Sequence, residues 1–114
     1  MSEQDLYPDI MYWLKYYLQG KFKKAQIETT AETSKRYLDE VLRDKGIFIP
    51  ETVGVKIKVD VVGIITLQNK PPQLAFVEVK DKPLTLKDLG QLWGYTKLIN
   101  PLESFLVSSK GIGT

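Results

Sequence analysis

Two valine-rich segments in the middle of the chain, separated by a turn, constrain the fold more than any other feature. Residues 53–61 place Val or Ile at every second position, which is the period of a β-strand with one apolar face. Residues 74–80 alternate in the same way, and the intervening Asn69-Lys70-Pro71-Pro72 has the composition of a turn. We therefore expect the two segments to form a β-hairpin.

Helical periodicity appears on both sides of this hairpin. Residues 6–19 and 34–45 repeat apolar side chains at spacings of three and four, and residues 86–99 form a third such segment behind the cap-like pair Thr85 and Asp88. The core stripe predicted for the third helix comprises Leu89, Leu92, Trp93, Thr96 and Ile99. Residues 21–30 predict a short strand or an extended connection, and residues 103–109 predict a last strand. This order indicates an α/β or α+β fold, with helices packed on a sheet.

The composition excludes several classes of chemistry. The 114 residues include no Cys and no His, which rules out disulfides, thiolate or imidazole metal ligands, and Ser/His or Cys/His catalysis. Any active site must then use carboxylates, Lys, Tyr or hydroxyl groups. A net charge of +2 permits a nucleic-acid partner. No apolar stretch is long enough to span a membrane and no signal peptide is evident, so we expect a cytoplasmic protein of one domain, residues 1–114, without a membrane partner.

Three charged residues interrupt the apolar pattern of the hairpin. Asp60 lies in Val-Asp-Val-Val, and Glu78 and Lys80 lie in Phe-Val-Glu-Val-Lys. Glu78 and Lys80 share one face of a strand at a separation of about 7 Å, and the neighbouring strand can bring Asp60 beside them. Two carboxylates suit Mg²⁺ or Mn²⁺, and an ammonium group nearby can orient a water for hydrolysis of a phosphodiester. The alternative is an ordinary surface ion pair on an edge strand.

Asp60, followed 18 residues later by Glu78-Val79-Lys80, resembles the motif of the PD-(D/E)XK nuclease superfamily. The segment Gln91-Leu92-Trp93-Gly94-Tyr95 is similar to the Gln-x-x-x-Tyr element of RecB-like members. The resemblance covers roughly residues 53–109. It implies a restriction-endonuclease-like fold, a small mixed β-sheet flanked by helices. Many relatives continue with another helix and strand, so the resemblance implies either a minimal version of the fold or a chain truncated at its C-terminus.

The resemblance also implies roles for individual residues. Asp60, Glu78 and the carbonyl group of Val79 would hold Mg²⁺ or Mn²⁺. Lys80 would position the attacking water, and Gln91 would support the site.

Further residues would complete the site or contact DNA. By the same resemblance, Tyr95 would contact DNA or brace the pocket. Lys56 and Lys58 share the face of Asp60, where phosphate contacts and a solvated strand face are the two interpretations. In the family an acidic residue of the first helix usually joins the site. Three residues of this chain compete for that position: Glu3, Asp5 and Asp9.

These features predict a metal-dependent DNA nuclease that hydrolyses phosphodiester bonds. The alternative is a binding or assembly module that keeps the fold without turnover. A homodimer is expected by analogy with nucleases that act on two strands. Gly90 and Gly94 lie one turn apart in the third predicted helix, where Gly is unfavourable. Close packing against the sheet or another chain explains them best, and close approach of DNA is the second explanation.

Overall fold

A mixed four-stranded sheet forms the centre of the computed structural model, which describes residues 2–110. Its strands lie in the order of the sequence: β1 (Gln26–Thr30), β2 (Val61–Thr66), β3 (Gln73–Lys80) and β4 (Glu103–Ser108). Strand β2 is antiparallel to both β1 and β3, whereas β4 is parallel to β3. A hairpin is confirmed as the β2–β3 pair, but its first strand begins later than predicted.

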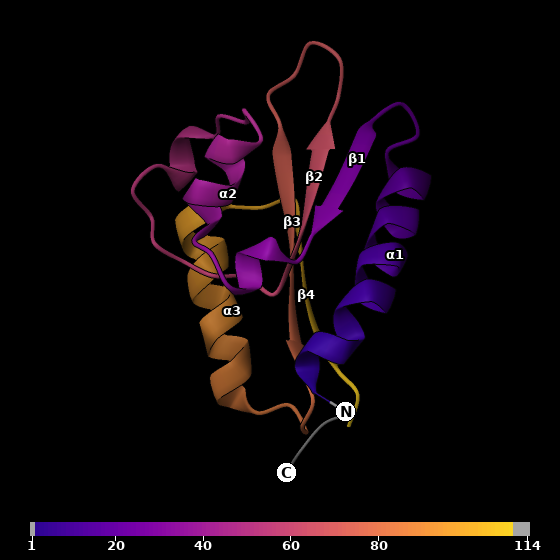
Figure 1. Cartoon of the computed structure of the whole chain (residues 1–114), viewed down its shortest axis with the longest axis vertical. Helices are drawn as coiled ribbons and strands as arrows, with labels where there is room; N and C mark the ends of the chain where they lie inside the picture. Colours follow the sequence, from indigo (N-terminus) through magenta and orange to yellow (C-terminus); the bar gives the residue numbers. More distant parts are fainter. Residues whose placement is uncertain (1, 111–114) are drawn as a thin grey trace.

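Helices cover both faces of the sheet. Helix α1 (Glu3–Lys21) packs on one face, and α2 (Leu38–Asp44) and α3 (Leu86–Ile99) pack on the other (Figure 1). Two short 3₁₀ turns, η1 (Glu32–Ser34) and η2 (Pro50–Thr52), lie in the connections. The predicted α/β architecture is confirmed at this level, and the restriction-endonuclease-like assignment stays a prediction.

None of the helices described in residues 2–110 combines the length and the hydropathy that crossing a membrane requires.

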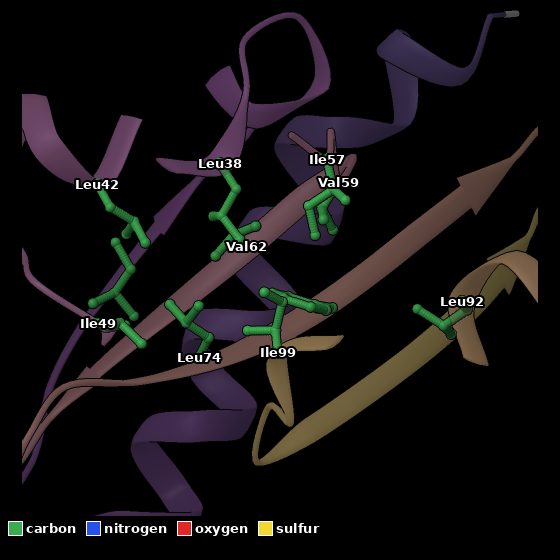
Figure 2. Close-up of a cluster of buried hydrophobic side chains, with 11 residues drawn as sticks. Leu38, Leu42, Ile49, Ile57, Val59, Val62, Leu74, Leu92 and Ile99 are labelled. Carbon is green, nitrogen blue, oxygen red and sulfur yellow. The ribbon is translucent and has the colours of Figure 1, made fainter. Parts of the chain in front are cut away.

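Strands β2 and β3 are buried on both faces, so the sheet separates two hydrophobic cores. Odd-numbered residues of β3, such as Val77, pack with Leu14 and Leu18 of α1. The even-numbered Leu74 and Phe76 pack with α2 and α3 in the cluster of Figure 2. Because side chains alternate along a strand, Glu78 continues the even-numbered row directly after fully buried Phe76. This position directs the Glu78 carboxyl group into the interior.

The predicted strand over residues 53–60 is wrong, because β2 begins only at Val61. No strand in the described part of the chain pairs with this segment, which instead binds the η1 turn: the N–H of Val59 donates to the carbonyl oxygen of Thr33 at 3.1 Å. The alternation still places Ile57 and Val59 in the core. Periodicity therefore predicted the buried side correctly, although the hydrogen-bonding partner is a turn.

Two predictions about helices also change. The helix predicted over residues 34–45 is shorter, since α2 begins at Leu38 after the η1 turn. The bounds predicted for α3 are confirmed, together with the cap in which the Asp88 N–H donates to Thr85 Oγ1 at 3.3 Å.

The predicted core stripe of α3 is only half correct. Leu92 and Ile99 are buried and Thr96 is half-buried, but Leu89 and Trp93 are exposed. The side of α3 that carries Asp88, Leu92 and Ile99 faces the sheet. Leu89 and Trp93 lie on a different side of the helix, which is exposed.

Two side chains of α1 leave no room for a Cβ atom at Gly63 in β2. A Cβ atom at this position would lie 2.7 Å from Leu18 Cδ1 and 3.1 Å from Leu14 Cδ2, and both leucines are fully buried. Gly63→Ala should therefore lower the free energy of unfolding by about 1–3 kcal/mol, as overpacked cores do. Gly20→Ala is the control, because nothing lies within 4 Å of its Cβ position and Ala is the better helix former. Urea unfolding measures both, and equal stabilities for the two variants would contradict this packing.

Candidate functional site

Asp60 and Glu78 meet at the end of the sheet where β3 finishes. Antiparallel pairing sets Val61 opposite Val77, so the next position outward brings Asp60 beside Glu78. The first turns of α1 and α3 lie at this same end of the molecule (Figure 1). Helix N-termini carry partial positive charge, which favours anionic groups nearby.

The Asp60 carboxylate is held by two hydrogen bonds from different parts of the fold. The hydroxyl group of Tyr7 in α1 donates to Oδ1 at 3.0 Å, and the backbone N–H of Val79 in β3 donates to Oδ2 at 2.7 Å. Asp60 is half-buried and Tyr7 is 9% exposed. Burial, followed by the negative charge of Asp60, raises the pKa of the Tyr7 hydroxyl above its usual range, so Tyr7 remains a donor.

Glu78 is more deeply buried than Asp60 and is not fully satisfied. Only 4% of the residue is exposed, and its Oε1 atom has no hydrogen-bond partner among residues 2–110. Burial, and next the Asp60 carboxylate, raise the pKa of Glu78 to about 8, while the positive charge of Lys80 acts in the opposite direction. An ionised Glu78 therefore needs a further positive partner.

The donor groups at this position fit a hard divalent cation. Carboxylate oxygens are preferred ligands of Mg²⁺ and Mn²⁺, and the orphaned Oε1 of Glu78 supplies one that nothing else uses. The carbonyl group of Val79 leaves β3 on the same edge as the N–H that binds Asp60. Within residues 2–110 no group of three or more Asp, Glu, His or Cys side chains is arranged to hold a metal. A cation here would complete its coordination with backbone, water or substrate oxygens, as Mg²⁺ commonly does.

The three acidic residues of α1 differ in their relation to this pair. Asp5 accepts a hydrogen bond from the N–H of Ser2 at 2.9 Å and so caps its own helix, and Asp9 is exposed. Glu3 lines a surface hollow of about 490 Å³ with Tyr7, and its charge also contributes to the raised pKa of Tyr7. Of the three, Glu3 is therefore the residue related to the pair through Tyr7, the hydrogen-bond partner of Asp60.

The other residues predicted for the site surround the carboxylates less directly. Lys80 is half-buried and makes no ion pair with any other residue in the described part of the chain. Gln91 is exposed, and its Nε2 donates to the Tyr95 hydroxyl at 3.0 Å instead of to a carboxylate. Tyr95 packs against the core beneath α3. The roles predicted for Gln91 and Tyr95 stay predictions.

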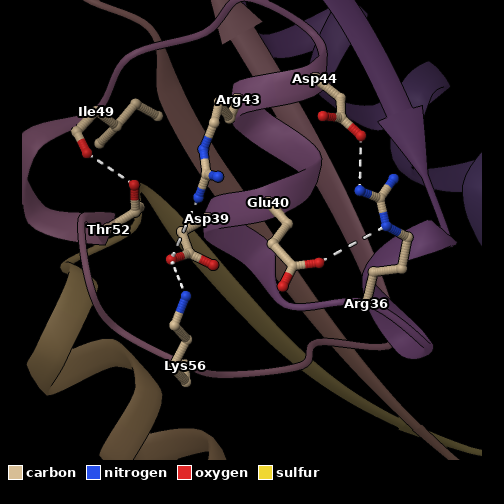
Figure 3. Close-up of polar contacts among 8 residues, drawn as sticks. All are labelled: Arg36, Asp39, Glu40, Arg43, Asp44, Ile49, Thr52 and Lys56. Atoms are coloured by element: carbon tan, nitrogen blue, oxygen red, sulfur yellow. Dashed lines mark hydrogen bonds and ion pairs between the residues drawn. The ribbon is translucent and has the colours of Figure 1, made fainter.

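Lys56 and Lys58 occupy different environments. Lys56 Nζ lies 2.8 Å from Oδ2 of buried Asp39, which Arg43 also approaches (Figure 3). This pairing ties α2 to the segment that leads to Asp60. Lys58 makes no such ion pair within residues 2–110, and its Nζ lies 5.2 Å from the centre of the Tyr37 ring. Of the two lysines, Lys58 is the freer to meet a phosphate.

Sequence reasoning missed two residues that position the carboxylates. In the sequence, Tyr7 is one of several aromatic residues of an amphipathic helix, and nothing distinguishes it from the others. Its partner Asp60 lies 53 positions away in the chain. Thr33 is fully buried and donates its hydroxyl to the Val59 carbonyl at 2.5 Å, directly before Asp60. Neither residue lies in a recognisable motif, so only the folded structure identifies them.

Comparison with known proteins gives no match: no family model fits the chain, and no curated protein or solved structure is detectably similar to it.

Glu78 should make the stability of the metal-free protein depend on pH. Its pKa is about 8 in the folded chain against 4.5 for an unperturbed Glu, so the folded state retains a proton that the unfolded state releases. The contribution of Glu78 to the free energy of unfolding is complete below pH 4.5 and is lost as the pH rises to about 8. Glu78→Gln, an isostere of the neutral acid, should remove this loss.

Urea unfolding of both proteins in EDTA across pH 4.5–9 tests this expectation. Glu78→Gln should be increasingly more stable than the wild type as the pH rises. Exposed Glu51→Gln is the control and should follow the wild type. Parallel stability curves for Glu78→Gln and the wild type would mean that Glu78 titrates normally.

Proposed function

We propose that this protein is a metal-dependent nuclease that hydrolyses DNA phosphodiester bonds, with a restriction-endonuclease-like fold. The observation that carries the proposal is the orphaned Oε1 of Glu78 beside the anchored carboxylate of Asp60. Two adjacent carboxylates, one deeply buried, are unfavourable together unless a proton or a cation joins them. The Glu78-Val79-Lys80 motif adds the ammonium group that hydrolysis of a phosphodiester can use.

Each residue of the motif has a distinct role in this proposal. Asp60, Glu78 and the Val79 carbonyl hold Mg²⁺ or Mn²⁺, which when bound supplies positive charge to stabilise phosphoryl transfer. Lys80 is near enough for its charge to act on Glu78, and no competing ion pair within residues 2–110 occupies it. Its ammonium group orients the attacking water and stabilises the hydroxide character that the water gains as its proton passes to solvent.

DNA is the proposed substrate, and the charge near the site supports an anionic ligand. Lys58, two residues before Asp60, is exposed. Lys82, two residues after Lys80, is exposed as well. Cations beside a metal site contact the phosphate backbone without reading sequence. The cytoplasmic location expected from the sequence stays a prediction.

Lys80→Ala separates catalysis from binding. The variant should keep its affinity for Mn²⁺ and DNA but cleave DNA at least about 100-fold more slowly, because Lys80 acts mainly in the transition state. Lys80→Arg should not restore the rate, since the guanidinium group is larger and planar. Lys70→Ala is the control and should retain cleavage, because Lys70 is exposed in the turn between β2 and β3, at the other end of the hairpin from Asp60 and Glu78.

The measurement is cleavage of single-stranded, duplex, flapped and four-way DNA, and of RNA, with Mg²⁺, Mn²⁺ or EDTA. Cleavage that depends on the metal and on Lys80 is the expected result. If the wild type cleaves none of these substrates, the nuclease proposal fails, and the binding or assembly module of the same fold replaces it.

Assembly into a homodimer is the second part of the proposal, and the outer face of α3 supports it. Leu86 is 87% exposed, Leu89 54% and Trp93 62%, which is unusual for three large apolar residues in one helical stripe. Apart from the helix's own backbone, no atom of residues 2–110 lies within 4 Å of a Cβ atom at Gly90 or Gly94, so these glycines do not serve packing on the sheet. A large residue flanked by two glycines can pack against its own copy across a two-fold axis.

Sedimentation velocity tests the dimer. The wild type should sediment as a dimer and Trp93→Ser as a folded monomer, because the substitution removes the largest apolar side chain of this face. Tyr12→Ser is the control, since Tyr12 is 76% exposed on α1 and lies outside the face. If the wild type remains monomeric at a protein concentration 100 times the lowest that the experiment detects, this interface is excluded.

A further inference from the structure

Tyr7 reaches the candidate site from the opposite side of the sheet to Glu78. Its ring packs among the residues beneath α1, with Leu14 and Val79 in the same cluster. Its hydroxyl group points out of that cluster to Asp60 Oδ1, at 3.0 Å. The ring of Tyr7 is therefore part of the hydrophobic core, and its hydroxyl group is part of the candidate site.

We propose that Tyr7 is a positioning residue, whose hydroxyl group fixes the orientation of the Asp60 carboxylate for binding a divalent cation. The proposal rests on the metal-dependent function proposed above. With the Val79 N–H on Oδ2 at 2.7 Å and Tyr7 on Oδ1, both oxygens are anchored and the carboxylate cannot rotate freely. Each ionised oxygen accepts more than one bond, so both retain a free lone pair for a cation.

The effect of losing this anchor follows from general experience with metal sites. Groups that hydrogen-bond to a metal ligand, without touching the metal, typically change metal affinity by about 10- to 100-fold when they are removed. Tyr7→Phe removes only the hydroxyl oxygen and keeps the ring in its cluster. We therefore expect weaker cation binding in a protein that is still folded.

Tyr17 provides a matched control on the same helix. Its hydroxyl group donates to Glu103 Oε2 at 3.1 Å, so Tyr17→Phe also deletes a tyrosine–carboxylate hydrogen bond of α1. Glu103 begins β4 and is not among the residues of the site. Any difference in cation binding between the two variants therefore reports the position of Tyr7.

Calorimetric titration with Mn²⁺, at one pH, compares wild type, Tyr7→Phe and Tyr17→Phe. Tyr7→Phe should bind Mn²⁺ about 10- to 100-fold more weakly, and Tyr17→Phe should match the wild type. Urea unfolding in EDTA should show similar small losses of stability for both variants. Equal Mn²⁺ affinity in Tyr7→Phe and wild type would overturn the role of Tyr7 and leave the proposed function standing. A wild type that binds neither Mn²⁺ nor Mg²⁺ would overturn both.

A second measurement avoids deleting any contact. One 3-fluorotyrosine is introduced at position 7, and in a separate sample at position 17. Addition of Mg²⁺ should shift the ¹⁹F resonance of the label at position 7, because its hydrogen-bond partner Asp60 binds the cation, and should leave the label at position 17 unchanged. A resonance at position 7 that does not respond, in protein whose Mg²⁺ binding calorimetry confirms, would overturn the proposal.

Discussion

The contact between two carboxylates at the end of the hairpin, one of them buried with an unpartnered oxygen, sets the conditions for the rest of the site. Removing a carboxylate from water is unfavourable by several kcal/mol unless charge or hydrogen bonds compensate. Glu78 cannot escape to solvent by a local change, because β3 is buried on both faces up to this position. A proton or a cation must therefore compensate the buried charge of Glu78. Burial of this carboxylate is thus the physical reason to expect a metal ion at the site.

Three separate elements deliver Asp60 to this contact. The β2–β3 register brings it opposite Glu78, the η1 turn holds the preceding residue through Thr33, and α1 contributes the Tyr7 hydroxyl. The contacts of Thr33 and Tyr7 are not needed merely to form a hairpin. Together they restrict both the backbone and the carboxylate of Asp60, which is the kind of restraint that metal ligands require.

The sequence predicts those parts of the molecule that depend on local patterns. Asp60 and Glu78 stand out because they interrupt apolar alternation, and Thr85 with Asp88 identifies the start of α3. Alternation before Val61 predicts which side chains are buried, but it cannot say whether a second strand lies alongside. Apolar residues on two sides of α3 likewise leave its rotation undetermined. The contact between Tyr7 and Asp60 joins positions far apart in the chain, so no local pattern contains it.

Anomalous X-ray diffraction from crystals grown or soaked with Mn²⁺ locates a bound cation directly. We expect one anomalous peak between the carboxylates of Asp60 and Glu78, within coordination distance of Oε1 of Glu78. The Tyr7 hydroxyl should remain bonded to the other side of Asp60. Well-ordered carboxylates with no anomalous peak between them, at millimolar Mn²⁺ and a pH above 8, would contradict the central claim that this pair is a metal site.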